Sequence, residues 1–81
     1  MDRDMALEHL VQAERIIAEG ERHIDHQERA VAELDRDGHD TQEALALLAM
    51  FRRTQAEHLA HRNLLLEMMH HHGRQDASRP S

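Results

Sequence analysis

The sequence predicts an all-α fold in which two long antiparallel helices form an αα-hairpin. Three observations support this prediction. Most of the first 70 residues are good helix formers such as Ala, Leu, Glu, Arg and Gln. Gly38 lies within a cluster of turn-forming residues, and the single proline is Pro80, so no proline interrupts the chain before it. No segment shows the alternation of β-branched or aromatic residues with polar ones that is typical of a strand.

The first helix is expected over residues 4–36, and its apolar residues follow a heptad repeat. One row of the repeat is β-branched or Leu, and the neighbouring row consists mainly of small residues. The first row is Leu10, Ile17, Ile24 and Val31, and the second is Ala6, Ala13, Gly20, Gln27 and Leu34. Two rows with this spacing are typical of a coiled coil. Gly20 weakens a helix interior, so its place in the second row indicates a steric role, and folding the chain back puts it opposite His58.

The turn is expected over residues 37–40. Gly38 suits the left-handed position just past a helix end. Asp40 can act as the N-cap of the next helix, with Glu43 completing a capping box, and Thr41 is the alternative cap. So short a connection forces the second helix to run antiparallel to the first.

The second helix is expected over residues 41–70, and a flexible tail is expected over residues 71–81. A helical wheel predicts one wide apolar face, interrupted by Gln55, His58 and Arg62. The face comprises Leu47, Leu48, Phe51, Leu59, Leu65, Leu66 and Met69. A separate apolar set, Met50, Leu64 and Met68, points in another direction, and this set is either a dimer face, a docking face or bundle core.

The chain is too poor in large apolar side chains for an isolated hairpin to be stable. It has 81 residues, one Phe and no Trp, Tyr or Cys. A second copy would cover the remaining apolar faces, so a homodimer forming a four-helix bundle is predicted. The predicted interface residues are Leu10, Ile17, Ile24, Val31, Leu48, Phe51, Leu59, Leu65, Met68 and Met69.

The charge pattern disfavours several classes of partner. All ten cations are Arg, and the net charge is −6, so binding to nucleic acid is not expected. No membrane span and no secretory signal are expected, which predicts a cytoplasmic protein.

The nine histidines suggest two alternative functions. The candidates for a metal site are two pairs, His23 with His26 and His58 with His61. Histidine also changes charge near neutral pH. The first alternative to an interaction module is therefore a metal-binding or pH-responsive bundle. The other alternative is a phosphorelay accessory protein, because the run from His61 to Leu65 loosely resembles the phospho-accepting box of one class of sensor kinases.

No enzyme activity and no cofactor are predicted, because no nucleophile lies beside a base. The run AERIIAEGERHIDHQERAVAELDRDGHDTQEALALLAMF, from Ala13 to Phe51, resembles short helical proteins of unassigned activity from bacterial genomes. The resemblance implies a helical hairpin and no activity. The function predicted from the sequence is therefore a small non-enzymatic interaction or regulatory module that acts as a homodimer.

Overall fold

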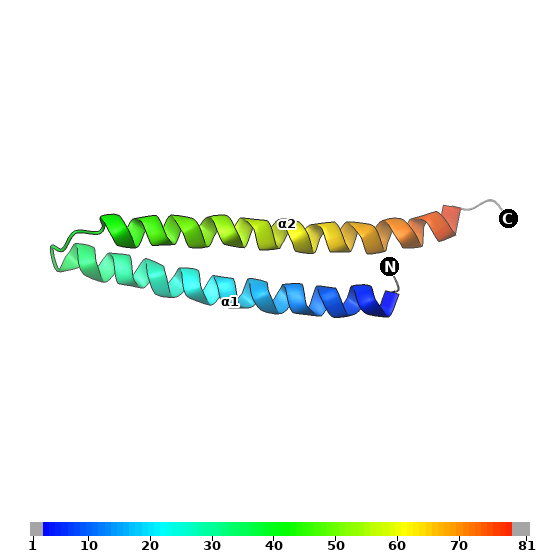
Figure 1. The fold of residues 1–81 in the computed structure, drawn as a ribbon, viewed down its shortest axis with the longest axis horizontal. Coiled ribbons are helices and arrows are strands. Elements are labelled where there is room, and N and C mark those ends of the chain that lie inside the picture. Colours follow the sequence, from blue (N-terminus) through cyan, green and yellow to red (C-terminus); the bar gives the residue numbers. More distant parts are fainter. Residues whose placement is uncertain (1–2, 79–81) are drawn as a thin grey trace.

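The chain folds into two helices that lie side by side and run antiparallel, so the predicted all-α hairpin is confirmed (Figure 1). The computed structural model describes residues 3–78, and it describes side chains for residues 3–70. Helix α1 spans Arg3–Arg36 and helix α2 spans Gln42–Ser78. The molecule is a rod of 69 × 18 × 14 Å. Neither of the two described helices is long and apolar enough to cross a membrane.

Helix α2 continues eight residues beyond His70, where the sequence predicted its end and the beginning of the tail. The glycine in this stretch, Gly73, costs a helix about 1 kcal/mol relative to Ala and does not break it. The first residue that is incompatible with a helix interior is Pro80. Residues 79–81 of the predicted tail lie outside the described residues.

The turn ends α1 with a Schellman motif centred on Gly38. The backbone N–H of His39 donates to the carbonyl of Leu34 over 2.8 Å, and that of Gly38 donates to Asp35 over 3.1 Å. These two bonds require a left-handed residue, and Gly38 has a φ of 76°. The predicted role of Gly38 is therefore confirmed.

The start of α2 makes the alternative cap, Thr41, the N-cap residue, and Glu43 makes no capping-box hydrogen bond to Asp40 within the described residues. The carbonyl of Thr41 accepts the first helical hydrogen bond, from the backbone N–H of Leu45 over 2.8 Å. The carboxylate of Asp40 accepts the backbone N–H of Gln42 over 3.0 Å. Glu43 lies in the first turn of α2, where a negative charge interacts favourably with the helix dipole. Thr41 is thus the N-cap residue. The Asp40 carboxylate, one position earlier, accepts from the backbone amide of Gln42, which has no partner within the helix.

In each helix, the residues that pack against the other helix follow heptad spacing. The buried and half-buried residues of α1 are the two rows predicted for it together with Ala30, and those of α2 share the same three-and-four spacing, apart from Leu59. We call the residues of α2 and of its N-cap that face α1 the core row: Thr41, Ala44, Leu48, Phe51, Gln55, His58, Arg62, Leu65 and Met69. This face is narrower than the predicted wide face, because Leu47 and Leu66 are exposed.

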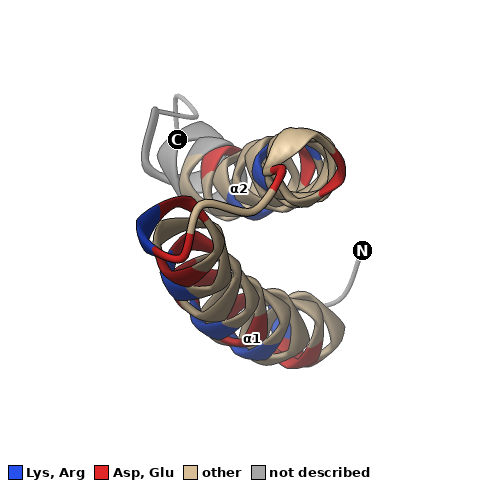
Figure 2. Cartoon of the chain, turned by 90° about the vertical axis from the view of Figure 1, so that its left-hand side faces the viewer, with Lys and Arg blue, Asp and Glu red and all other residues tan. Residues whose placement is uncertain are grey.

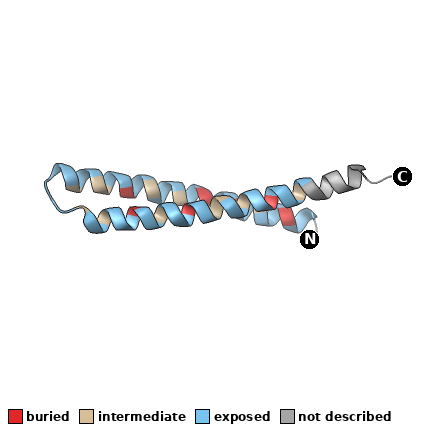
Figure 3. Cartoon of the chain, turned by 90° about the horizontal axis from the view of Figure 1, so that it is seen from above, coloured by how far each residue is buried: buried red, intermediate tan, exposed pale blue. Residues whose placement is uncertain are grey.

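The apolar core between the helices is thin. Its buried apolar members are Ala6, Ala13, Ile17, Leu48 and Leu65, and two of these five are alanines. Figure 3 shows the buried positions as single residues spaced along the line where the helices meet, with exposed surface around them. Near the centre of the hairpin, two buried glutamines, Gln27 and Gln55, lie among these apolar residues.

Candidate functional site

Two buried glutamines link the helices near the middle of the rod. The amide of Gln27 in α1 donates to the carbonyl of Ala44 in α2 over 2.9 Å. The amide of Gln55 in α2 donates to the carbonyl of Ile17 in α1 over 2.8 Å. Each helix therefore sends one glutamine to the backbone of the other. A hydrogen bond of this kind stabilises a fold by about 1 kcal/mol, and a buried polar residue in a heptad row fixes the register of the two helices.

Gly20 provides the space that Gln55 needs. A Cβ atom at residue 20 would overlap the amide oxygen of Gln55. The predicted steric role of Gly20 on the packed face is thus supported, but the residue that fills its space is Gln55 and not the expected His58. Gln55 is 7% exposed, and its Oε1 has no hydrogen-bond partner within the described residues. Such a buried, unpaired carbonyl costs about 1–3 kcal/mol, so Gln55 contributes more to register than to stability.

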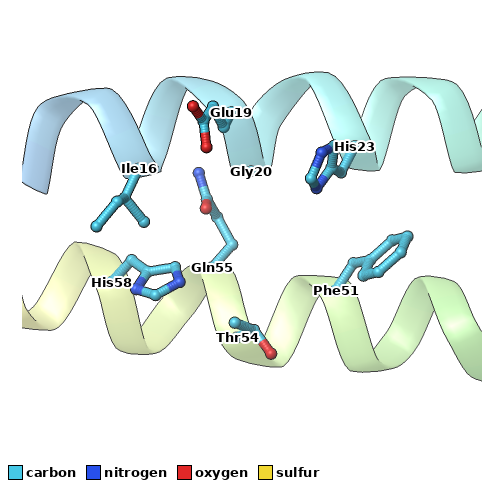
Figure 4. Close-up of a pocket in the computed structure, with 8 residues that line it drawn as sticks. All are labelled: Ile16, Glu19, Gly20, His23, Phe51, Thr54, Gln55 and His58. Carbon is cyan, nitrogen blue, oxygen red and sulfur yellow. The ribbon is translucent and has the colours of Figure 1, made fainter.

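A shallow recess of about 160 Å³ opens beside Gln55 on one flank of the hairpin. Figure 4 shows Gln55 pointing across to Gly20, with His23 and Phe51 to one side and Ile16 and His58 to the other. The rings of His23 and Phe51 have centroids 6.0 Å apart and are tilted by 43°. The recess brings His23 and His58 to the same flank of the molecule.

The four predicted metal-site histidines do not form a site within one chain. His58 is half-buried, and His23, His26 and His61 are exposed. Among the residues whose side chains are described, no three histidine or carboxylate groups come close enough together to hold a metal ion.

The structure places most of the predicted interface residues inside the hairpin. Ile17, Leu48 and Leu65 are buried. The half-buried members of the set are Leu10, Ile24, Val31, Phe51, Leu59 and Met69. Met68 is the exception, at 45% exposure. Their contacts with a second copy stay a prediction.

Helix α2 carries a second heptad stripe on one flank of the hairpin, next to the core row. We call it the outer row: Leu47, Met50, Thr54, Glu57, His61, Leu64 and Met68. All seven side chains are exposed, and the row includes the separate apolar set that the sequence predicted. The row runs along the same flank as the recess, because Thr54 lines that recess together with Ile16 and His23 of α1. Sequence reasoning found only part of the row, although its three-and-four spacing is visible in the sequence.

The two flanks of the hairpin differ in charge. On the flank opposite the outer row, Glu28 and Asp35 of α1 line a groove with Leu45 and Leu48 of α2. Glu28 also pairs with Arg52 there, over 3.6 Å. Charged residues are concentrated on α1, which has 14 among its 34 residues, whereas residues 42–70 of α2 have six (Figure 2). The least charged long surface is thus the flank formed by the outer row.

In comparisons with protein families, curated proteins and solved structures, no match to this chain was found.

Proposed function

We propose that the protein is a non-enzymatic helical interaction module that acts as a homodimer, with the outer rows of two hairpins packed together in a four-helix bundle. The observation on which the proposal rests is the exposure of large apolar side chains in that row. Met50 is 51% exposed, Leu64 53% and Met68 45%. An exposed apolar stripe on a small protein marks an interaction surface.

The accessible area supports a second copy as the occupant. A compact monomer of 9.4 kDa exposes about 5,000 Å². This hairpin exposes 6649 Å². The excess, about 1,600 Å², is larger than the roughly 800 Å² that each partner buries in a standard interface. The surplus is therefore large enough to supply a standard interface with one additional hairpin.

The distribution of apolar residues and charge favours the outer-row flank over the opposite one. Of the ten exposed large apolar residues, six have heptad positions on this flank and four on the other. The six are Met5, Ile16, Leu47, Met50, Leu64 and Met68. The opposite flank carries Glu14, Glu21, Glu28 and Asp35 from α1 at the positions next to the packed face. Two of these carboxylates are paired within the hairpin, Glu28 with Arg52 and Glu14 with Arg62, so this flank is the more charged of the two and the outer-row flank the more apolar.

The outer row is self-complementary when a second α2 runs antiparallel to it. Its residue types read nearly the same from both ends, with apolar residues at both ends and polar ones in the middle. A two-fold axis at the middle of the row, near Glu57, places Met50 against the partner's Leu64 and Leu47 against the partner's Met68. A self-complementary patch of this kind is what a two-fold symmetric interface requires.

The proposal is tested by replacing Leu64 with glutamate. Symmetry places this residue in the interface twice, and burying each half-covered copy stabilises the dimer by about 1.5 kcal/mol, so Leu64→Glu weakens dimerisation by about 100-fold. The measurement is the dimer dissociation constant from sedimentation velocity, with helix content followed by circular dichroism.

Leu66→Glu is the matched control. Leu66 is also exposed, at 43%, and lies two residues away on the opposite flank of the same helix. The control variant keeps the dimer. Equal loss of the dimer in both variants would contradict the assignment of the outer row as the interface.

A further inference from the structure

We propose that the flank opposite the outer row binds one amphipathic α-helix of another protein, in which arginine or lysine recurs at every seventh residue beside an apolar stripe. The proposal goes beyond the homodimer and does not depend on it. The surface lies between the two helices of a single hairpin, on the flank that the outer row leaves uncovered.

A groove between the two helices opens on this flank, near the turn. It has a volume of about 400 Å³, and its floor is apolar: Leu48 is buried, Val31 is half-buried and Leu45 is exposed. Glu28 and Asp35 of α1 also line the groove, and both side chains are exposed. An apolar groove between helices is the kind of surface in which an amphipathic helix lays its apolar face.

The apolar surface continues from this groove along α2. Leu59, which is half-buried, and Leu66, which is exposed, share the heptad position of Leu45. Ala49 and Ala56 are exposed on the same flank, one heptad apart. Their small side chains allow another helix to approach α2 closely, so the leucines become the contacts that such a helix covers.

Helix α1 borders this apolar surface with four carboxylates at heptad spacing. We call them the acidic row: Glu14, Glu21, Glu28 and Asp35. All four side chains are exposed. The row extends about 32 Å along the helix, and neighbouring members are about 10 Å apart. A helix that lies along the groove therefore meets one carboxylate at every seventh residue of its own.

The hairpin itself shows which group the acidic row attracts. Two arginines of α2 pair with members of the row, each over 3.6 Å: Arg52 with Glu28, and Arg62 with Glu14. The side chains of the other two members, Glu21 and Asp35, make no hydrogen bond or ion pair within the described part of the chain. Cations of a partner complement these two carboxylates. Such pairs select the partner and its register, while the apolar groove supplies most of the affinity.

The experiment titrates a fluorescent synthetic peptide with the full-length chain. The peptide is an amphipathic helix of about 21 residues, long enough to follow the acidic row, with Leu and Ala on one face and Arg at every seventh residue. A matched peptide carries Glu at the arginine positions. Fluorescence anisotropy at low ionic strength gives the dissociation constant and the stoichiometry. Sedimentation velocity of the unlabelled chain reports dimerisation separately.

We expect one arginine peptide to bind per chain, at least about tenfold more tightly than the glutamate peptide. Reversing the two unpaired carboxylates, with Glu21→Arg and Asp35→Arg, inverts this preference. The matched control, Glu8→Arg with Glu33→Arg, changes the net charge equally at exposed positions of α1 outside the acidic row, and it keeps the preference for the arginine peptide. Leu64→Glu in the outer row leaves peptide binding intact.

Three results would overturn the inference. Equal affinity for the two peptides, or no binding of either to the folded chain, shows that the acidic row selects no basic helix. Equal effects of the two double reversals reduce the preference to net charge. Loss of peptide binding in the Leu64→Glu variant places the peptide on the outer row. The dimer dissociation constant is measured without peptide, so none of these results bears on the homodimer.

Discussion

Gly20 and Gln55 show how single residues set the packing of this hairpin. The side chain of Gln55 occupies the space above Gly20 and reaches the carbonyl of Ile17. A methyl group at residue 20 would force the Gln55 amide away from this carbonyl. The two residues therefore act as one unit, in which the glycine gives up helix propensity so that the glutamine can bridge the helices.

A double-mutant cycle tests this unit. Gly20→Ala raises helix propensity by about 1 kcal/mol, but in the wild-type chain it also breaks the Gln55 hydrogen bond, worth about 1 kcal/mol. We expect the substitution to be neutral or destabilising in the wild type. In the Gln55→Ala background, where the space is free, it stabilises by about 1 kcal/mol. Urea unfolding at one fixed chain concentration measures all four free energies.

The cycle has a clear negative result. If Gly20→Ala changes the free energy of unfolding equally in both backgrounds, the two residues are not coupled, and Gly20 has no steric role toward Gln55.

At the scale of the elements, the turn determines how the two helices meet. Gly38 adopts a φ of 76°, and a Cβ placed there would have no neighbour within 4 Å. Any effect of substitution is therefore conformational and not a clash. The two Schellman hydrogen bonds and the Asp40 cap close α1 and start α2 within a few residues.

Gly38→Ala is expected to destabilise the fold by about 1–2 kcal/mol, the cost of holding an L-residue in the left-handed region. Gly38→Asn is expected to cost less, because asparagine tolerates this conformation. Thermal and urea unfolding of the two variants provide the comparison. Equal stability of Gly38→Ala and the wild type would show that the turn does not require the left-handed conformation.

The elements were largely predictable from sequence, and the details of their contact were not. Caps, glycine and heptads are local signals, and they located the end of α1 at Arg36 and placed the start of α2 within a residue of Gln42. The residue predicted to lie opposite Gly20 was His58, one helical turn away from the residue that lies there, Gln55. The prediction was wrong because the antiparallel register depends on how the turn is built. Gln55 was missed as a bridging residue, since its role depends on a backbone carbonyl in the other helix, which no pattern of side chains reveals.

At the scale of the whole molecule, the apolar core is thin because several of the larger apolar side chains lie in the exposed outer row instead. The buried apolar residues between the helices are few and partly alanine, while larger ones such as Met50 and Leu64 are exposed. Apolar composition alone predicted that a partner is needed. The face that we propose a partner covers is defined by exposure, which separates the core row of α2 from its outer row.

The mass of the chain in solution tests the central claim, the homodimer, most directly. Sedimentation equilibrium of the full-length protein at micromolar concentration gives this mass without reference to shape. The proposed homodimer predicts about twice the chain mass of 9.4 kDa. A mass of about 9.4 kDa, together with a helical circular dichroism spectrum and cooperative unfolding, would contradict it.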